Sequence, residues 1–297
     1  MAAALIDGKK IAEEIRQEVK DEAGRLREKS GVVPGLAFIL VGDNPASESY
    51  VRSKGKACEE TGFYSITERM SADTTEEALL AQVKRFNTDP KIHGLLVQLP
   101  LPKQINEQKV IEAVSPQKDV DGFHPYTVGR LVIGEDTFKP CTPAGVQELL
   151  MRSGNDPSGK HVVIVGRSNI VGKPVANILL QKMTGANAVV TVAHTGARDI
   201  AYYTKQADIL IAAIGRPEAI RGDMLKPGVV VIDVGINRIP DASKKSGHRL
   251  VGDVHFASAS EVARAITPVP GGVGPMTIAM LMKNTLKAAK LLTAPSN

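Results

Sequence analysis

Tyr50 and Lys54 are the first residues of this 297-residue chain whose types and spacing could do chemistry. They stand four positions apart in a segment expected to be helical, so both side chains would project from one face. A lysine that a neighbouring ring partly shields from water can exchange protons near neutral pH, and a tyrosine ring can stack on a flat ligand. From spacing alone, an ordinary amphipathic pair with a solvated Lys54 is the stronger interpretation.

Gln98 ends an otherwise apolar segment, residues 93–98, that is expected to be a strand. In open α/β sheets, ligands bind beyond the carboxyl ends of the strands. Gln98 could therefore bond to Lys54 or to a substrate. A bond from Gln98 to the loop backbone fits the sequence equally well.

The loop Lys118–Gly122 offers two carboxylates, Asp119 and Asp121. A carboxylate can grip an amidine-like edge, such as that of a pterin, with two parallel hydrogen bonds. The alternative is that these side chains only stabilise a turn. Turn formation explains Asp119 well and Asp121 less clearly.

A glycine-containing loop, residues 166–174, follows the apolar segment 161–165 and precedes an expected helix. This order is typical of the first βα unit of a dinucleotide-binding domain, where glycine permits close backbone approach and the helix N-terminus favours phosphate. The match is incomplete, because Ser168 stands where the second glycine of G-x-G-x-x-G belongs. An ordinary tight turn explains the loop alone equally well, and the series of four strands that it belongs to favours the cofactor site.

The next expected strand ends at Ala193 and carries no acidic residue that could bind a ribose hydroxyl, as NAD sites often do. Arg167 could instead meet the 2′-phosphate of NADP, although it could equally be a solvated surface residue. Ile236 follows another expected strand and could make an apolar contact to a cofactor ring.

Residues 267–275 form a loop rich in glycine and proline. The loop lacks the Lys-Ser/Thr ending of a P-loop, which excludes triphosphate binding. Taken alone, it is best explained as a plain connection into the last helix.

The elements that must position these residues alternate along the chain, which predicts an α/β fold with mainly parallel sheets. The second half is expected to form a doubly wound, Rossmann-like domain. Residues 140–143 are interpreted as a hinge. Helices are predicted at 9–29, 47–61, 75–87, 106–113, 143–152, 173–182 and 276–292, and strands at 35–41, 93–98, 161–165, 188–193, 209–214 and 229–234.

The composition argues against nucleic-acid-binding, metal-binding, secreted and membrane proteins. The net charge of +5 comes from scattered residues, aromatic residues are 4% and tryptophan is absent, so we expect no nucleic-acid partner. The two cysteines and six histidines show no metal-ligand spacing, which predicts no metal site and a reducing compartment. No signal peptide is recognised and no segment reaches the ~20 apolar residues of a membrane helix, so a cytoplasmic protein is expected.

Taken together, the motifs resemble those of the bifunctional methylenetetrahydrofolate dehydrogenase/methenyltetrahydrofolate cyclohydrolase family. The resemblance covers nearly the full chain in order, and its last motif is highly specific. The motifs are Tyr50-x-x-x-Lys54, Val97–Pro100, Lys118–Gly122, Pro140–Pro143, Val165–Ser168, Val171–Gly172, Gly252–Val254 and Ile266–Thr277.

The resemblance implies a folate-binding catalytic domain over residues 1–143, completed by a C-terminal helix at 275–297. It implies an NAD(P)-binding domain over residues 144–274, a substrate cleft between the two, and a homodimer formed through the cofactor domain. The implied reaction oxidises methylenetetrahydrofolate with NADP and then hydrolyses methenyltetrahydrofolate to 10-formyltetrahydrofolate.

By the same resemblance, Lys54 is the proton-shuttling residue and Gln98 supports it. Tyr50 packs against the folate and Asp121 anchors the pterin. The other implied folate-binding residues are Val97, Leu99, Pro270, Gly271, Gly272, Val273 and Gly274. The implied cofactor-binding residues are Gly166, Arg167, Ser168, Thr195 and Ile236.

Three alternatives stay open. A subset of the family uses NAD, with phosphate and magnesium, despite a similar Gly-Arg-Ser loop, and Thr195 stands where a serine is usual. The chain could thus be an NAD-dependent monofunctional methylenetetrahydrofolate dehydrogenase. A generic NAD(P) hydroxy-acid dehydrogenase would need a His/Asp or Arg/carboxylate pair, and none stands out. A nucleotide-sensing module without enzymatic activity would not depend on Lys54.

Overall fold

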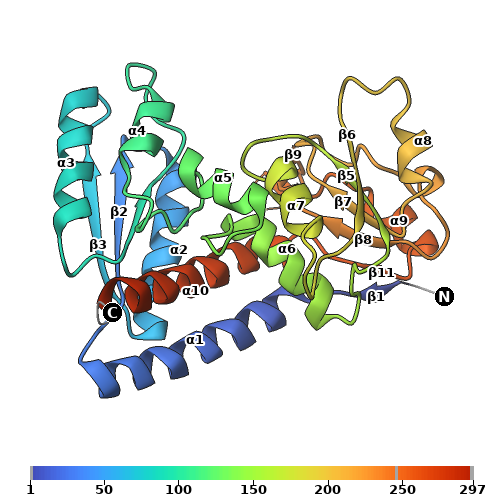
Figure 1. The fold of residues 1–297 in the computed structure, drawn as a ribbon. Helices are drawn as coiled ribbons and strands as arrows, with labels where there is room; N and C mark the ends of the chain where they lie inside the picture. The colour runs from blue at the N-terminus through green and yellow to red at the C-terminus, as the bar shows by residue number, and fades with distance from the viewer. Residues whose placement is uncertain (1–2, 245–246, 295–297) are drawn as a thin grey trace. The chain divides into compact units, whose positions relative to one another are not determined.

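The computed structural model describes residues 3–244 and 247–294 (Figure 1). Contacts divide the chain into two compact units. The six-stranded unit holds the described residues up to Ala12 together with Thr142–Thr277, and the three-stranded unit holds Glu13–Cys141 together with the residues from Ile278 onward. The sequence-based division also assigned a folate role and a cofactor role to the two parts, and it stays a prediction.

The three-stranded unit is built on a parallel sheet in the order β3-β2-β4, formed by β3 (Tyr64–Met70), β2 (Gly35–Val41) and β4 (Gly94–Val97). All seven residues of β2 are buried, because this strand is central and is covered on both faces. The predicted bounds of β2 are confirmed. β3 was not predicted, because it is an edge strand whose residues are all exposed or half-buried.

Helices α2 (Pro45–Thr61), α3 (Glu76–Thr88), α4 (Glu107–Ala113) and α5 (Pro125–Ile133) follow the strands of this unit. Two of them begin where a side chain accepts the first free amides: Thr75 bonds to the amide of Ala78, and Asn106 to those of Gln108 and Lys109. The helix α5, which we did not predict, follows His124 and ends at Gly134 in the left-handed region.

The C-terminal helix α10 (Val273–Thr293) returns to the three-stranded unit from Ile278 onward, as predicted. The side-chain amide of Asn284 on this helix donates to the carbonyls of Val120, at 2.8 Å, and Lys139, at 2.9 Å. The start of this helix corrects the sequence analysis, because Val273 and Gly274 lie in its first turn and not in the preceding loop. Likewise α6 (Cys141–Arg152) begins inside the segment interpreted as a hinge.

The six-stranded unit has a fully parallel main sheet in the order β1-β11-β8-β7-β5-β6, which confirms the doubly wound fold. The chain runs from β5 to β6 on one side and then crosses to β7 on the other, so the strand order reverses at β5 and β7. Such a switch point is where ligands bind in these sheets. The strands are β1 (Ala4–Leu5), β5 (His161–Val165), β6 (Val189–Ala193), β7 (Ile209–Ala212), β8 (Val230–Asp233) and β11 (Ala265–Ile266).

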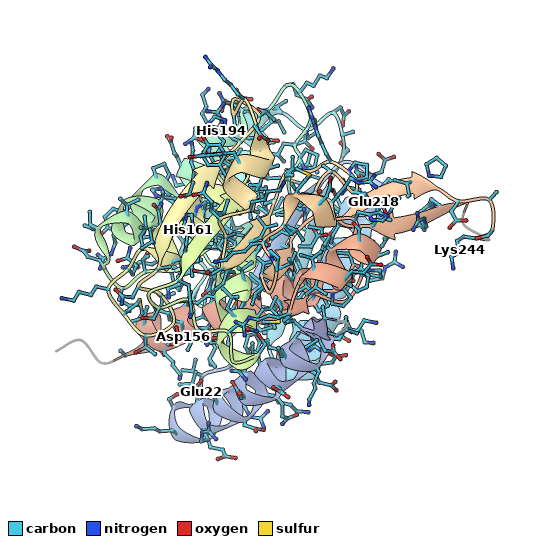
Figure 2. The ribbon with its side chains drawn as sticks, turned by 90° about the vertical axis from the view of Figure 1, so that its right-hand side faces the viewer. Glu22, Asp156, His161, His194, Glu218 and Lys244 are labelled. Carbon is cyan, nitrogen blue, oxygen red and sulfur yellow. The ribbon has the colours of Figure 1, made fainter. Side chains whose placement is uncertain are left out.

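Short elements complete this unit, and most were not predicted. α7 (Gly172–Leu179) ends three residues earlier than expected. Figure 2 shows a two-stranded hairpin that extends from the unit, with Lys244 near its end. The long helix α1 (Gly8–Ser30), which begins in this unit, was predicted at 9–29. The other elements, which were not predicted, are α8 (Ile200–Thr204), the 3₁₀ helix η1 (Gly222–Met224), α9 (Phe256–Val262) and the hairpin strands β9 (Asn237–Pro240) and β10 (His248–Val251).

Candidate functional site

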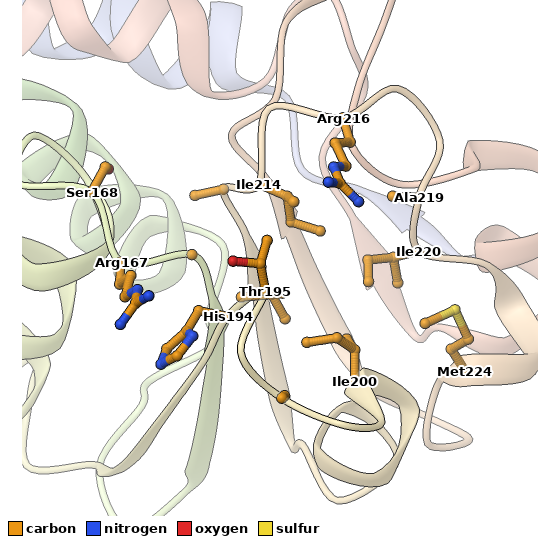
Figure 3. Close-up of a pocket in the computed structure, with 14 residues that line it drawn as sticks. Arg167, Ser168, His194, Thr195, Ile200, Ile214, Arg216, Ala219, Ile220 and Met224 are labelled. Atoms are coloured by element: carbon orange, nitrogen blue, oxygen red, sulfur yellow. The ribbon is translucent and has the colours of Figure 1, made fainter.

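A pocket of about 460 Å³ opens at the carboxyl ends of β5, β6 and β7, at the switch point of the sheet. Its volume lies in the usual range for small-molecule sites. Figure 3 shows Arg167 and His194 on one side of the pocket and Arg216 on the other. The apolar wall is formed by Ile200, Ile214, Ile220 and Met224. The pocket therefore offers positive charge at its edges and an apolar surface for a flat ring.

The backbone of the turn after β5 lies so close to neighbouring carbonyl groups that only glycine fits at two of its positions. A Cβ on Gly166 would lie 2.1 Å from the carbonyl oxygen of Ala213, and the residue has a φ of +133°. A Cβ on Gly172 would lie 2.2 Å from the carbonyl oxygen of Gly166. The backbone at Gly166 is thus packed against Ala213 while it lines the pocket, and the turn folds back tightly onto the start of α7.

Ser168, which replaces the second glycine of the fingerprint, has a local task. Its Oγ accepts hydrogen bonds from the amides of Val171, at 3.1 Å, and Gly172, at 3.4 Å. The serine thereby holds the turn that begins α7 and stays among the residues that line the pocket.

Four of the five predicted cofactor residues line this pocket: Gly166, Arg167, Ser168 and Thr195. Ile236 does not line it. Its side chain is 48% exposed, and its Cδ1 lies 3.5 Å from the position that a Cβ on Gly274 would occupy. The wall formed by Ile200, Ile220 and Met224 was not predicted, because isolated apolar residues in separate short segments carry no recognisable spacing.

The three-stranded unit brings Lys54 and Gln98 together. The side chain of Lys54 is only 8% exposed, and its Nζ donates to Oε1 of Gln98 at 3.1 Å. The Nε2 of Gln98 donates to the carbonyl of Leu99 at 2.7 Å. Gln98 therefore makes both bonds considered from the sequence, and the amine is held in a buried position instead of being solvated.

Asp121 lies within electrostatic range of Lys54. Burial raises the pKa of the Asp121 carboxyl, and the positive charge of Lys54 opposes this rise. The thiol of Cys141 also donates to Oδ1 of Asp121, at 3.8 Å. An amine, an amide and a carboxylate from three separate segments thus form one polar cluster, Lys54, Gln98 and Asp121.

Asp119 and Lys118 have structural roles in the same loop. The carboxylate of Asp119 accepts from the backbone amides of Gly122, Phe123 and His124 at 2.9 to 3.2 Å, and burial raises its pKa to about 6. The Nζ of Lys118 donates to the carbonyls of Phe86 and Asp89. Only Asp121 of this loop is therefore a candidate for binding a ligand.

The other predicted folate-binding residues lie in both units. Val97 and Leu99 are half-buried in the three-stranded unit, and Tyr50 is 48% exposed there. The segment Pro270–Gly274 lies in the six-stranded unit, where Gly271 accepts the backbone amide of Lys9 at 3.1 Å. The tight packing of this segment explains its glycines, because a Cβ on Gly272 would lie 2.6 Å from the carbonyl oxygen of Pro268.

The described residues hold neither a metal-ligand cluster nor a membrane-spanning helix. Within residues 3–244 and 247–294, no group of three or more histidine, cysteine, aspartate or glutamate side chains is arranged to hold a metal ion. Over the same ranges, no helix has both the length and the apolar character needed to cross a membrane.

Two family models match the chain. The model for the tetrahydrofolate dehydrogenase/cyclohydrolase catalytic domain matches residues 6–121, and the model for the NAD(P)-binding domain of the same family matches residues 140–293. A curated relative, the bifunctional protein FolD of Syntrophus aciditrophicus, is 59% identical over 98% of this chain and 99% of its own.

Two solved structures are similar over nearly the whole chain. The bifunctional FolD methylenetetrahydrofolate dehydrogenase/cyclohydrolase of Campylobacter jejuni is 49% identical, with a TM-score of 0.92 over 98% of this chain and 99% of that one. The Trypanosoma brucei methylenetetrahydrofolate dehydrogenase-cyclohydrolase, complexed with NADP and an inhibitor, is 42% identical, with a TM-score of 0.92 over 98% of each chain.

Proposed function

We propose a function from one premise: this chain belongs to the tetrahydrofolate dehydrogenase/cyclohydrolase family. It oxidises methylenetetrahydrofolate to methenyltetrahydrofolate with NADP, and it hydrolyses the product to 10-formyltetrahydrofolate. One observation supports both activities independently of the similarity to known proteins: the same chain has a nucleotide-sized pocket at the switch point and a buried Lys54 held by Gln98. A hydroxy-acid dehydrogenase would need no such buried amine.

The pocket fits NADP. The backbone of Gly166 lines the pocket at the turn that leads to the N-terminus of α7, where a phosphate-bearing ligand can bind. Arg167 supplies a planar cation that can pair with the 2′-phosphate, and Thr195 supplies a hydroxyl beside it. When bound, NADP supplies the acceptor for the hydride that leaves the methylene carbon. In this proposal Ile236, from outside the pocket lining, adds an apolar contact to the cofactor.

Alignment is the main task of the protein in the oxidation step. In our proposal, the carboxylate of Asp121 grips the amidine-like edge of the pterin with two hydrogen bonds, and the exposed ring of Tyr50 packs on the folate. The positive charge of Lys54 supports this role, because it favours the ionised form of Asp121. Val97, Leu99 and the segment Pro270–Gly274 contribute apolar and backbone surface.

Proton transfer is the main task in the hydrolysis step. Water adds to the methenyl carbon, one carbon–nitrogen bond of the ring breaks, the carbon stays on the other nitrogen as a formyl group, and one proton is released. Lys54 takes up and returns protons during the addition and the ring opening. Gln98 fixes the amine through the 3.1 Å hydrogen bond and so directs it toward the reacting carbon.

A spectrophotometric assay with methylenetetrahydrofolate and each nicotinamide cofactor in turn tests the function. We expect reduction of NADP and a slower reaction with NAD, because NAD lacks the 2′-phosphate that Arg167 would bind. Faster turnover with NAD would favour the monofunctional NAD-dependent alternative. Absence of turnover with both cofactors would refute the proposed function.

We further propose that the protein is a cytoplasmic homodimer. The two cysteines, Cys58 and Cys141, are buried and unpaired, which suits a reducing compartment. Light scattering on the purified protein should give about twice the chain mass of 31.6 kDa. A mass equal to one chain at micromolar concentration would contradict the dimer.

A further inference from the structure

Two buried aspartates lie behind the cofactor pocket, in the segments Asp233–Gly235 and Gly252–Val254. Asp233 is 3% exposed and Asp253 is fully buried. The function described above uses neither of them. The segment Gly252–Val254 is one of the motifs on which the family resemblance rests, but no binding or catalytic role was assigned to it.

Asp253 holds two loops at once. Its Oδ2 accepts the backbone amides of Ile214, at 2.5 Å, and Gly215, at 2.9 Å. Its Oδ1 accepts the side-chain amide of Asn237, at 2.8 Å. Its backbone carbonyl accepts the amide of Ile220 at 3.0 Å. Ile214 and Ile220 both line the pocket, so one residue fixes the backbone at two points of the apolar wall.

Asp233 fixes the segment that carries Asp253. Its carboxylate accepts the amides of Gly235, Asp253 and Val254, each at 2.9 Å, and its own amide donates to Oγ1 of Thr267. Burial raises the pKa of Asp233 to about 7, and the neighbouring charge of Asp253 adds to this rise. The two carboxylates are therefore close enough to influence each other.

The glycine of each segment makes room for the carboxylate of the other. A Cβ on Gly252 would lie 1.8 Å from Oδ2 of Asp233, and a Cβ on Gly235 would lie 2.3 Å from Oδ1 of Asp253. This reciprocal fit explains why aspartate and glycine occur together in both segments. It also ties the loop after β7 to the segment 235–237, which contains Ile236.

We infer that Asp253 is a positioning residue for NADP: it holds the pocket wall at Ile214 and the segment carrying Ile236 in the arrangement that the cofactor requires. The inference rests on the proposed cofactor site. Asp253 acts through backbone amides and through Asn237, and it does not itself line the pocket. Without this carboxylate, the pocket wall would be less ordered in the free enzyme. Ordering it when NADP binds would then reduce the affinity for NADP.

The test is Asp253→Asn in the full-length enzyme, with both half-reactions measured. Asparagine keeps the shape but replaces one acceptor oxygen by a donor, so either the Ile214–Gly215 amides or Asn237 lose their partner. We expect the KM for NADP and its dissociation constant from calorimetry to rise at least tenfold. The KM for methylenetetrahydrofolate and the cyclohydrolase rate should stay within twofold of wild type, because that chemistry depends on Lys54.

Asp156→Asn is the matched control. Asp156 is exposed and its Oδ1 also accepts a backbone amide, that of Ser158 at 3.0 Å. Figure 2 shows Asp156 well away from His194, which lines the pocket. This variant should bind NADP as wild type does. If Asp253→Asn does not fold, Asn237→Ala removes one bond of the same carboxylate and should raise the NADP dissociation constant several-fold.

Two results would overturn the inference. One is wild-type NADP affinity in a folded Asp253→Asn. The other is a parallel loss of both substrate affinities and of the cyclohydrolase rate, which would mean that Asp253 only stabilises the fold. Failure of the proposed function is distinguishable from both, since it would remove NADP-dependent turnover from the wild-type enzyme as well.

Discussion

Asp119 and Asp121 stand two positions apart in one loop, yet their surroundings give them different tasks. Asp119 accepts three backbone amides and so holds the loop. Asp121 faces the charge of Lys54, which counteracts the effect of burial on its pKa. A carboxylate that must stay ionised in order to bind a pterin edge needs such a neighbour. The hydrogen bonds of Asp119 therefore identify it as a turn former, and the ligand role of Asp121 stays our proposal.

The raised pKa of Asp119 predicts a pH dependence of stability. The folded-state pKa of about 6 exceeds the usual aspartate pKa of 3.8, so the native state keeps a proton that the unfolded state loses. The resulting stabilisation is complete below pH 3.8 and is lost as pH rises through 6. Roughly 1.4 kcal/mol of it should disappear between pH 5 and pH 8, about one pKa unit in free energy.

Urea unfolding at pH 5 and pH 8 measures this loss. Asp119→Asn should lose less free energy of unfolding between the two pH values than wild type, whatever its stability at either one. The exposed Asp43→Asn should leave the difference unchanged. An equal pH difference in wild type and Asp119→Asn would show that Asp119 does not retain a proton in the folded state.

At the scale of elements, continuous apolar runs bounded by turn residues predicted the central strands well. β2 and β5 have the predicted bounds, because both strands are buried on two faces and need apolar residues throughout. The edge strand β3 was missed because its seven residues, Tyr-Ser-Ile-Thr-Glu-Arg-Met, form no continuous apolar run and none of them is fully buried. The two-residue strands β1 and β11 are too short to show any pattern.

The candidate site was predictable where its residues cluster in the sequence. Gly166, Arg167 and Ser168 follow one strand directly, so the strand–turn–helix order located them. The partnership of Asp233 and Asp253 was not predictable, because these residues are twenty positions apart and the hairpin strands β9 and β10 lie between them in the chain. Contacts of this kind depend on packing between segments, which no local pattern records.

The turn between β5 and α7 should tolerate no side chain at its first position. Gly166→Ala would place a Cβ 2.1 Å from the carbonyl oxygen of Ala213 and so push β5 and β7 apart at the pocket. We expect a loss of NADP binding of at least tenfold, together with lower stability of the six-stranded unit. Calorimetric titration with NADP and thermal unfolding measure the two effects.

Gly129→Ala is the control for this substitution. Gly129 lies in α5, and a Cβ there would have no atom within 4 Å. Alanine should therefore keep NADP affinity and raise helix stability by up to about 1 kcal/mol. Wild-type NADP affinity in Gly166→Ala would show that the close approach of the backbone is not needed for the cofactor.

At the scale of the whole molecule, the residues that we propose for NADP binding and for proton transfer lie in different units. The pocket at the switch point lies in the six-stranded unit, and the cluster of Lys54, Gln98 and Asp121 lies in the three-stranded unit. In our proposal, oxidation needs the pocket and the folate-binding residues, whereas hydrolysis of methenyltetrahydrofolate needs the folate-binding residues and the amine of Lys54. We therefore expect that each activity can be lost separately: substitutions in the pocket should remove oxidation alone, and substitution of Lys54 should remove hydrolysis alone.

The most direct test of this account is Lys54→Ala, with NADP reduction and methenyltetrahydrofolate followed in the same reaction. Hydrolysis should fall at least about 100-fold, the usual contribution of a proton-transfer group, so methenyltetrahydrofolate should accumulate while NADP is still bound and reduced. Lys56→Ala, which removes a largely exposed lysine two positions away, should behave as wild type. Hydrolysis at the wild-type rate in Lys54→Ala would contradict the central claim that this buried amine carries the cyclohydrolase step.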